Sequence, residues 1–162
     1  MTFGRPLAKP MKGLEMLTKK GKYGLKAMVE LARLPEGRTM LLTDIAGAND
    51  IPKPFLEIIL GELRQAGFVR SKKGKGGGYA LAQPAAEIHI GHVVRALDGA
   101  LAPISCASRA FYKRCDDCVD EETCSVRLMM LDVRAAVSEV LDRRTVADML
   151  ALTSVDELMA HI

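Results

Sequence analysis

The sequence predicts a mainly α-helical fold with one small β-hairpin, and three observations support this prediction. Apolar residues recur at helical spacing in two stretches, over residues 18–32 and 54–67. Two short apolar segments flank a run of lysines and glycines at 72–78, as strands flank a turn. A longer helical pattern follows from residue 124, with apolar residues spaced alternately by four and three. At 162 residues and 49% apolar content, the chain can bury the core of one domain and extend an accessory element.

The first core helix is expected to begin after a short leader. Residues 1–15 hold two prolines and two glycines without helical or strand periodicity, which predicts a disordered leader and makes Met16 an alternative first residue. Thr18 is placed to cap a helix with an amphipathic pattern, and Pro35-Glu36-Gly37 ends it.

Two further helices follow, joined by a tight turn. Thr43 is expected to cap a short helix, and Asn49-Asp50 supplies the turn. The next helix is expected to begin near Pro54 and to end at Gly67, with apolar residues at 55, 56, 59, 60 and 63. This pair predicts a helix–turn–helix.

A basic hairpin comes directly after the helix pair. Residues 68–71 and 79–81 read as short strands around a tip that contains three lysines and four glycines, residues 72–78. The tip leads into a strand and lacks the Gly-Lys-Ser/Thr ending of a nucleotide phosphate loop. A DNA-contacting wing fits the hairpin better, with a merely solvated turn as the alternative, so residues 16–99 predict a winged helix–turn–helix domain.

The rest of the chain predicts a loop and a self-pairing helix. A helix over 88–97 ends at Asp98-Gly99, and residues 100–123 form a loop with little periodicity. From Cys124 onward, a coiled-coil-like seam runs through Val126, Met130, Val133, Val137 and Val140. We expect the 124–142 helix to form a homodimer with its copy, rather than to pack on its own domain. Short helices capped by Thr145 and Ser154 complete the 124–162 segment.

Charge and hydropathy limit the possible partners. Residues 1–85 hold 15 Lys and Arg against 7 Asp and Glu, whereas residues 86–162 hold 8 against 13. The basic half is a candidate polyanion-binding surface, with solvated lysines as the alternative. No apolar run approaches the roughly 20 residues that cross a bilayer, and a secretory signal is not evident. We therefore expect a cytoplasmic protein with no membrane partner.

The residues that point to chemistry are four cysteines, the only ones in the chain: Cys106, Cys115, Cys118 and Cys124. Eight, two and five residues separate them, so the close pair can hold one centre while the outer two fold in from either side. Structural zinc, an iron–sulfur cluster and a metal-free thiol–disulfide switch all remain open. Five nearby acidic residues favour cation capture and raise thiol pKa values, which argues against a low-pKa redox thiol. An enzyme or electron carrier is less favoured, because no Ser/His/Asp or paired-carboxylate arrangement accompanies the loop.

Taken in order, several segments resemble the Rrf2 family of bacterial winged-helix transcriptional regulators, whose members sense iron–sulfur status, nitric oxide or iron. The segments are Leu17–Tyr23, Ile51–Phe68, Gly76–Tyr79, Ile90–Val93 and the cysteine loop. The resemblance covers about residues 16–150. It implies a homodimeric, DNA-binding regulator with its recognition helix in the major groove of an operator and its wing in the minor groove.

Carried over to this chain, the resemblance places recognition at Pro54, Phe55, Glu57 and Ile58, and the wing tip at Lys73 and Gly74. Phosphate contacts are expected from lysines beside these elements, namely Lys19, Lys20, Lys53, Lys72 and Lys75. Two departures concern the wing and the recognition helix. Lys73 stands where an arginine is usual and loses the planar fork, and Ile58 stands where cluster-assembly regulators have a glutamine.

The ligand set departs from the family as well. Relatives commonly use three cysteines with a histidine or an acidic residue as fourth ligand, whereas the corresponding positions here are Arg127 and Lys22, which are poor iron ligands. Cys115 then becomes the expected fourth ligand, with a spare thiol as the alternative. We therefore predict a regulator that holds a 4Fe–4S or 2Fe–2S cluster on four cysteines, with zinc or a metal-free thiol switch as alternatives.

Overall fold

The computed structural model describes residues 16–152, 155 and 159, so the predicted leader over 1–15 and the predicted cap Ser154 lie outside the described residues. The described helices are α1 (Lys19–Ala32), α2 (Leu42–Asn49), α3 (Lys53–Gln65), α4 (Ile90–Asp98), α5 (Ser125–Arg143) and α6 (Val146–Ala151), with short 3-10 turns η1 (Ala85–Glu87) and η2 (Ser105–Ala107). The strands β1 (Val69–Lys72) and β2 (Gly78–Leu81) form one antiparallel hairpin. The predicted mainly helical fold with a small β-wing is confirmed.

Helix α1 is the centre of the winged part, because it packs against α2, α3, α4 and α6. Thr18 caps it as predicted, with its hydroxyl oxygen accepting from the Gly21 N–H at 3.3 Å. Its buried face includes Met28 and Leu31, which join the side chains of α3 and α4 in one core. Burial of this apolar stripe is what fixes the helix in place.

The helix–turn–helix has one boundary that differs from the prediction. Helix α2 begins at Leu42 with Leu41 at the capping position, so Thr43 lies in the first turn and its predicted capping role is wrong. The backbone carbonyl of Leu41 accepts from the Ile45 N–H at 3.1 Å, which is the first hydrogen bond of the helix. No side chain among the described residues caps this end of α2. Asp50, at φ 52°, makes the predicted turn, and Gly67, at φ 82°, lies just past the end of α3.

The wing is a tight hairpin with an additional edge contact. Val69 pairs with Leu81 at its base and Lys72 with Gly78 at its tip. Met40 and Tyr79 exchange two backbone hydrogen bonds of 2.9 and 2.8 Å, which attaches the segment before α2 to β2. The hairpin is therefore joined to the helix–turn–helix twice, by the chain that leads from α3 into β1 and by the pairing of β2 with the segment before α2.

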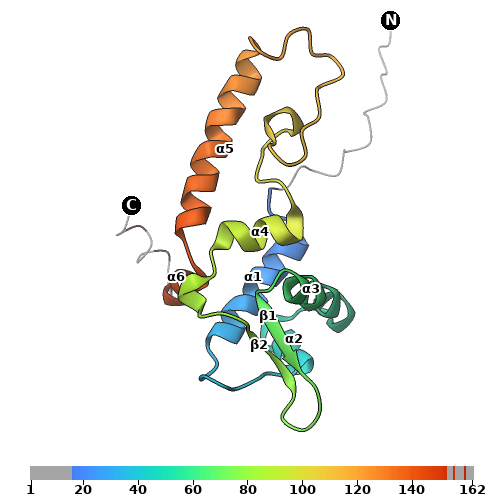
Figure 1. Ribbon diagram of the computed structural model, residues 1–162, viewed down its shortest axis with the longest axis vertical. Helices are drawn as coiled ribbons and strands as arrows, with labels where there is room; N and C mark the ends of the chain where they lie inside the picture. Colours follow the sequence, from blue (N-terminus) through green and yellow to red (C-terminus); the bar gives the residue numbers. More distant parts are fainter. Residues whose placement is uncertain (1–15, 153–154, 156–158, 160–162) are drawn as a thin grey trace, which may run out of the picture.

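Helix α5 extends away from the winged part, and the loop over residues 100–123 lies beside it (Figure 1). All 19 of its residues are described and none is buried. The chain then returns, and α6 packs on α1 with Val146 fully buried. Thr145 caps α6 in a capping box with Asp148, as predicted. Among the described residues, no helix combines the length and the apolar content needed to cross a membrane.

The close approach of α1 to α4 generates a stability prediction. A Cβ at Gly24 would lie 2.2 Å from Leu97 Cδ1, whereas a Cβ at Gly47 in α2 would meet nothing within 4 Å. We expect Gly24→Ala to lower the free energy of unfolding by about 1–3 kcal/mol, because Leu97 is buried and has to move. The control Gly47→Ala should raise it by about 0.5–1 kcal/mol. Urea unfolding followed by far-ultraviolet circular dichroism measures both, and equal effects would contradict the close packing.

Candidate nucleic-acid interface and cysteine loop

The outward face of α3 carries most of the predicted recognition residues. Lys53, Pro54, Glu57 and Ile58 are exposed on it. Phe55 differs, because it is half-buried and its ring lies edge-to-face on Tyr23 of α1, with centroids 5.7 Å apart. Phe55 therefore packs α3 against α1, and the exposed residues form the surface that can meet a ligand.

Two polar contacts border this face. On one flank Lys20 of α1 donates to Glu62 at 2.9 Å, and on the other Arg64 donates to Ser71 of the hairpin at 3.1 Å. The line from Pro54 to Ile58 runs between these flanks. Lys20 is thus a tether of α3 in the described conformation, whereas Lys19 beside it is exposed and is available to a phosphate.

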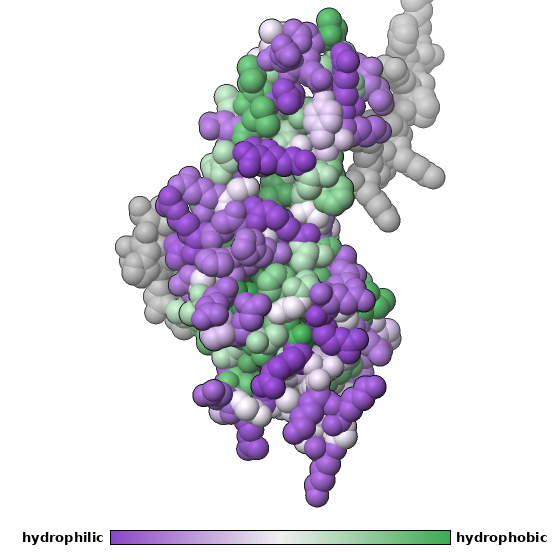
Figure 2. Space-filling model, in the orientation of Figure 1, coloured by the Kyte–Doolittle hydropathy of each residue, from purple (hydrophilic) through white to green (hydrophobic). Residues whose placement is uncertain are grey.

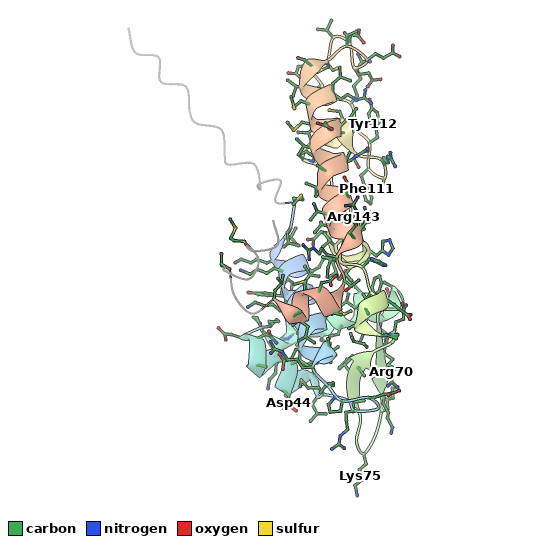
Figure 3. All side chains as sticks on the ribbon, turned by 90° about the vertical axis from the view of Figure 1, so that its left-hand side faces the viewer. Asp44, Arg70, Lys75, Phe111, Tyr112 and Arg143 are labelled. Atoms are coloured by element: carbon green, nitrogen blue, oxygen red, sulfur yellow. The ribbon has the colours of Figure 1, made fainter. Side chains whose placement is uncertain are left out.

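The hairpin tip projects from the same part of the molecule. Lys72, Lys73, Gly74 and Lys75 are all exposed, and Lys75 lies at the far end of the wing in Figure 3. The Thr39 hydroxyl donates to the Gly76 carbonyl at 2.9 Å and holds the base of the tip. Figure 2 shows hydrophilic side chains projecting as separate fingers at this end. An exposed helix can enter the major groove of a DNA duplex, and a projecting basic hairpin beside it can enter the minor groove.

Two arginines near this surface were missed from the sequence. Arg64 at the end of α3 and Arg70 on β1 are both exposed, and the Arg70 Nε donates to the Leu81 carbonyl at 3.2 Å. The sequence periodicity could have identified both. Arg64 lies two helical turns after Glu57 and so shares its side of α3, and Arg70 follows the buried Val69 on β1 and so faces the opposite, exposed side. Both add positive charge between the recognition helix and the wing.

The cysteine loop lies at the opposite end of the molecule from the hairpin (Figure 1). The short turn η2 places Cys106 in a buried position, and Cys124 is the residue that precedes α5. Cys115 is exposed, Cys118 is half-buried, and all four are free thiols. The Cys118 N–H donates to the Cys115 carbonyl at 3.2 Å, so this pair forms one tight turn, as its two-residue spacing suggests.

The Cys115 thiol is influenced by other residues of the loop. The pKa of the Cys115 thiol is raised, first by its hydrogen bond with Cys106, then by desolvation and by the negative potentials of Cys106, Asp117 and Cys124. The direction of the shift in pKa is the one expected for an acidic loop, but Asp117 contributes less to it than Cys106 and desolvation do. Cys115 is the most exposed of the four cysteines, and Cys106 and Cys124, far from it in the sequence, both act on its pKa.

Arginine side chains hold the loop to α5 through its backbone. Arg127 donates from Nε to the Cys106 carbonyl at 3.0 Å and from Nη1 to the Glu121 carbonyl at 2.9 Å. About two helical turns further along α5, Arg134 donates to the Ala107 carbonyl at 3.2 Å. Hydrogen bonds from a charged donor are stronger than neutral ones. Arg127, which the sequence analysis considered only as a poor iron ligand, therefore has a structural role that was not predicted.

The loop residues fit a soft-metal centre in their chemistry and connectivity. Thiolates suit iron–sulfur clusters and zinc, and four of them lie within one loop that spans Cys106 to Cys124. Within residues 16–152 with 155 and 159, however, no three His, Cys, Asp or Glu side chains surround a common metal position. A centre that uses all four sulfurs therefore requires the exposed part of the loop to change conformation.

Helix α4 connects the two candidate sites. Arg95 of α4 makes a bidentate ion pair with Asp142 of α5, with N–O distances of 2.6 and 2.8 Å. This hydrogen bonding lowers the pKa of Asp142 and raises that of Arg95. Three residues later, at the C-terminal end of α4, Asp98 accepts from the Thr18 N–H and hydroxyl at 2.9 and 2.5 Å. The base of α5 is thus linked through α4 to the start of α1.

Comparisons with known proteins agree with this geometry. The chain matches the model of the Rrf2 family, described as an iron-dependent transcriptional regulator, over residues 17–152. It is 42% identical over 139 residues to an rrf2-like helix–turn–helix transcriptional regulator of Rhodobacter capsulatus, covering 84% of this chain and 93% of the relative.

Two solved structures show the same fold. The global cysteine regulator CymR of B. subtilis has a TM-score of 0.70 and 33% sequence identity, and the match covers 85% of this chain and 97% of that chain. IscR of T. potens has a TM-score of 0.65 and 31% identity, covering 93% of each chain. These relatives are transcriptional regulators rather than enzymes.

Proposed function

This chain belongs to the Rrf2 family of transcriptional regulators, and we propose that it binds operator DNA in the cytoplasm as a homodimer controlled by an iron–sulfur cluster on its cysteine loop. The observation that carries the DNA-binding part is the pairing of an exposed α3 face with an exposed lysine hairpin on one end of the molecule. The helix has the dimensions of a major-groove reader, and the hairpin is narrow enough for a minor groove.

Lys73 tests the wing. We expect Lys73→Ala to weaken binding to all duplexes to a similar degree, because a single lysine contacts phosphates rather than identifying bases. The slope of log K against log salt concentration should become shallower by about 1 for each wing that loses its contact. Fluorescence anisotropy with labelled duplexes at several salt concentrations measures both quantities.

The control for Lys73 is Lys113→Ala, which removes an exposed lysine from the cysteine loop at the other end of the molecule. It should leave affinity and salt slope unchanged. A Lys73→Ala variant that changed the ranking of duplex sequences without changing the salt slope would contradict phosphate contact.

The homodimer is supported by the surface of α5. Apolar side chains repeat along its exposed side at spacings of three and four, at Val126, Met129, Val133, Ala136 and Val140. Val126, Met129 and Val140 are each about 60% exposed, at 61, 59 and 59%. Met130 and Val137 of the predicted seam are half-buried at the edge of this stripe. A 19-residue helix with such a stripe gains its stability by packing against another apolar surface, and the same stripe of a second copy provides one.

A charge at Val133 tests this interface. We expect Val133→Glu to convert a dimer into a monomer, because it places a carboxylate in the centre of the proposed apolar seam. Leu128→Glu is the control, since Leu128 is also an exposed apolar residue of α5 but lies on another side of the helix, near Asp132. Sedimentation equilibrium measures the masses. A dimer that persists in Val133→Glu, or is lost equally in both variants, would contradict the stripe as the interface.

The cluster is the proposed controlling element. Cys106, Cys115, Cys118 and Cys124 would hold it, and when bound it would supply reversible electron transfer and a centre that reacts with oxidants. The family description as iron-dependent supports iron over zinc. The free thiols of Cys106 and Cys115, of which the first raises the pKa of the second, support the second candidate, a metal-free regulator that switches by a disulfide between them.

Metal analysis of anaerobically purified protein separates these candidates. We expect iron and acid-labile sulfide, and a loss of most of both in Cys115→Ser, because a four-cysteine site loses a ligand. Ser125→Ala, next to Cys124, is the control and should retain both. Colourless protein with stoichiometric zinc would contradict the cluster in favour of zinc. Metal-free protein that forms a Cys106–Cys115 disulfide with a mild disulfide oxidant would support the switch instead.

A further inference from the structure

The recognition helix has an unusual centre for a DNA-contacting surface. Four apolar residues of α3, Leu56, Ile59, Leu60 and Leu63, are fully buried, whereas Ile58 is 58% exposed. A single exposed isoleucine has no significance on an ordinary surface. Ile58 lies, however, between the Lys20–Glu62 and Arg64–Ser71 contacts, near the middle of the exposed face of α3 that the proposed function presents to DNA.

The neighbours of Ile58 leave its side chain free to reach a groove floor. Pro54 precedes it by one turn and has an apolar ring, and Gly61 follows it by three residues without a side chain. A Cβ at Gly61 would meet nothing within 4 Å, so the space above this part of the helix is open. Gln65 continues the same line and is exposed. Ile58 is therefore the most protruding apolar group on the face.

The chemistry of the major groove limits what Ile58 can recognise. Guanine, cytosine and adenine present hydrogen-bonding atoms there, and the C5-methyl group of thymine is the apolar feature of the standard bases. Isoleucine has no donor or acceptor, so it gains from burial against a methyl group and leaves polar base atoms unsatisfied elsewhere. Glu57 beside it is an acceptor that suits the cytosine amino group.

We infer that Ile58 is a specificity-determining residue that contacts the C5-methyl group of a thymine in each operator half-site, with a cytosine within reach of Glu57. This inference rests on the proposed DNA-binding function and adds the base that the helix selects. It differs from what a glutamine at this position would do, because an amide selects adenine through paired hydrogen bonds, whereas Ile58 selects by apolar contact alone.

Removal of single methyl groups from the DNA tests the contact directly. Operators are first selected by the full-length protein from a random duplex library, and each thymine of the preferred site is then replaced by deoxyuridine, which lacks only the C5-methyl. We expect one thymine per half-site whose replacement weakens wild-type binding about fourfold, and about fifteenfold when both half-sites are changed. In Ile58→Ala the same replacements should change affinity less than twofold.

Two variants show that the effect belongs to this side chain. Ile58→Val keeps a branched apolar group and should keep part of the deoxyuridine effect, and Gln65→Ala on the same face should keep all of it. Since Ile58 is largely exposed, all three variants should melt as the wild type does in circular dichroism. Wild-type protein insensitive to deoxyuridine at every thymine, or an equal loss in Ile58→Ala, would overturn the inference. Failure of the library to yield any preferred sequence would instead contradict the proposed function.

Discussion

Helix α4 determines how the two ends of this molecule are joined. Arg95 binds Asp142 at the base of α5, and Asp98 binds Thr18 at the start of α1. Backbone hydrogen bonds from Ile90 to the Arg144 carbonyl and from Val146 to the Ile88 carbonyl, at 2.8 and 2.9 Å, reinforce the first joint. Because α1 also packs against α3, a displacement at the base of α5 has a continuous path of contacts to the recognition helix. Such a path is one physical route by which a change in the cysteine loop can reach the proposed recognition helix.

The exposed surface of α5 and the separation of charge follow from this arrangement. The winged part buries one shared core, and α5 extends beyond it with only one side resting on its own chain. Lysines project from the hairpin, whereas Asp116, Asp117 and Asp120 lie in the loop at the other end. In the proposed DNA complex, the acidic loop would lie at the opposite end of the molecule from the duplex, and repulsion by the phosphates falls off over a screening length of about 10 Å.

The parts that were predictable from sequence are those set by local chemistry. Thr18, Gly67 and Thr145 mark helix ends because capping depends on residues a few positions away, and the hairpin follows from its lysine and glycine tip. Contacts between distant segments were not predictable in the same way. The pairing of Met40 with Tyr79 and the return of α6 to α1 depend on the assembled core. At the candidate sites, the half-burial of Phe55 against Tyr23 and the hydrogen bonds of Arg127 likewise depend on neighbours far along the chain.

The attachment of the cysteine loop indicates where a bound centre would act. Arg127 and Arg134 hold the carbonyls of Cys106 and Ala107, so this part of the loop is placed by α5 without any sulfur ligand. Residues 109–117, by contrast, are exposed throughout, and Cys115 carries a raised pKa, so metal binding there has to displace a proton. In the proposed holo protein, the cluster would draw Cys115 and Cys118 toward a Cys106 that is already fixed on α5. The resulting change in loop order would occur beside α5, the proposed dimer helix. Helix α5 contacts α4, and α4 in turn contacts α3, the proposed recognition helix.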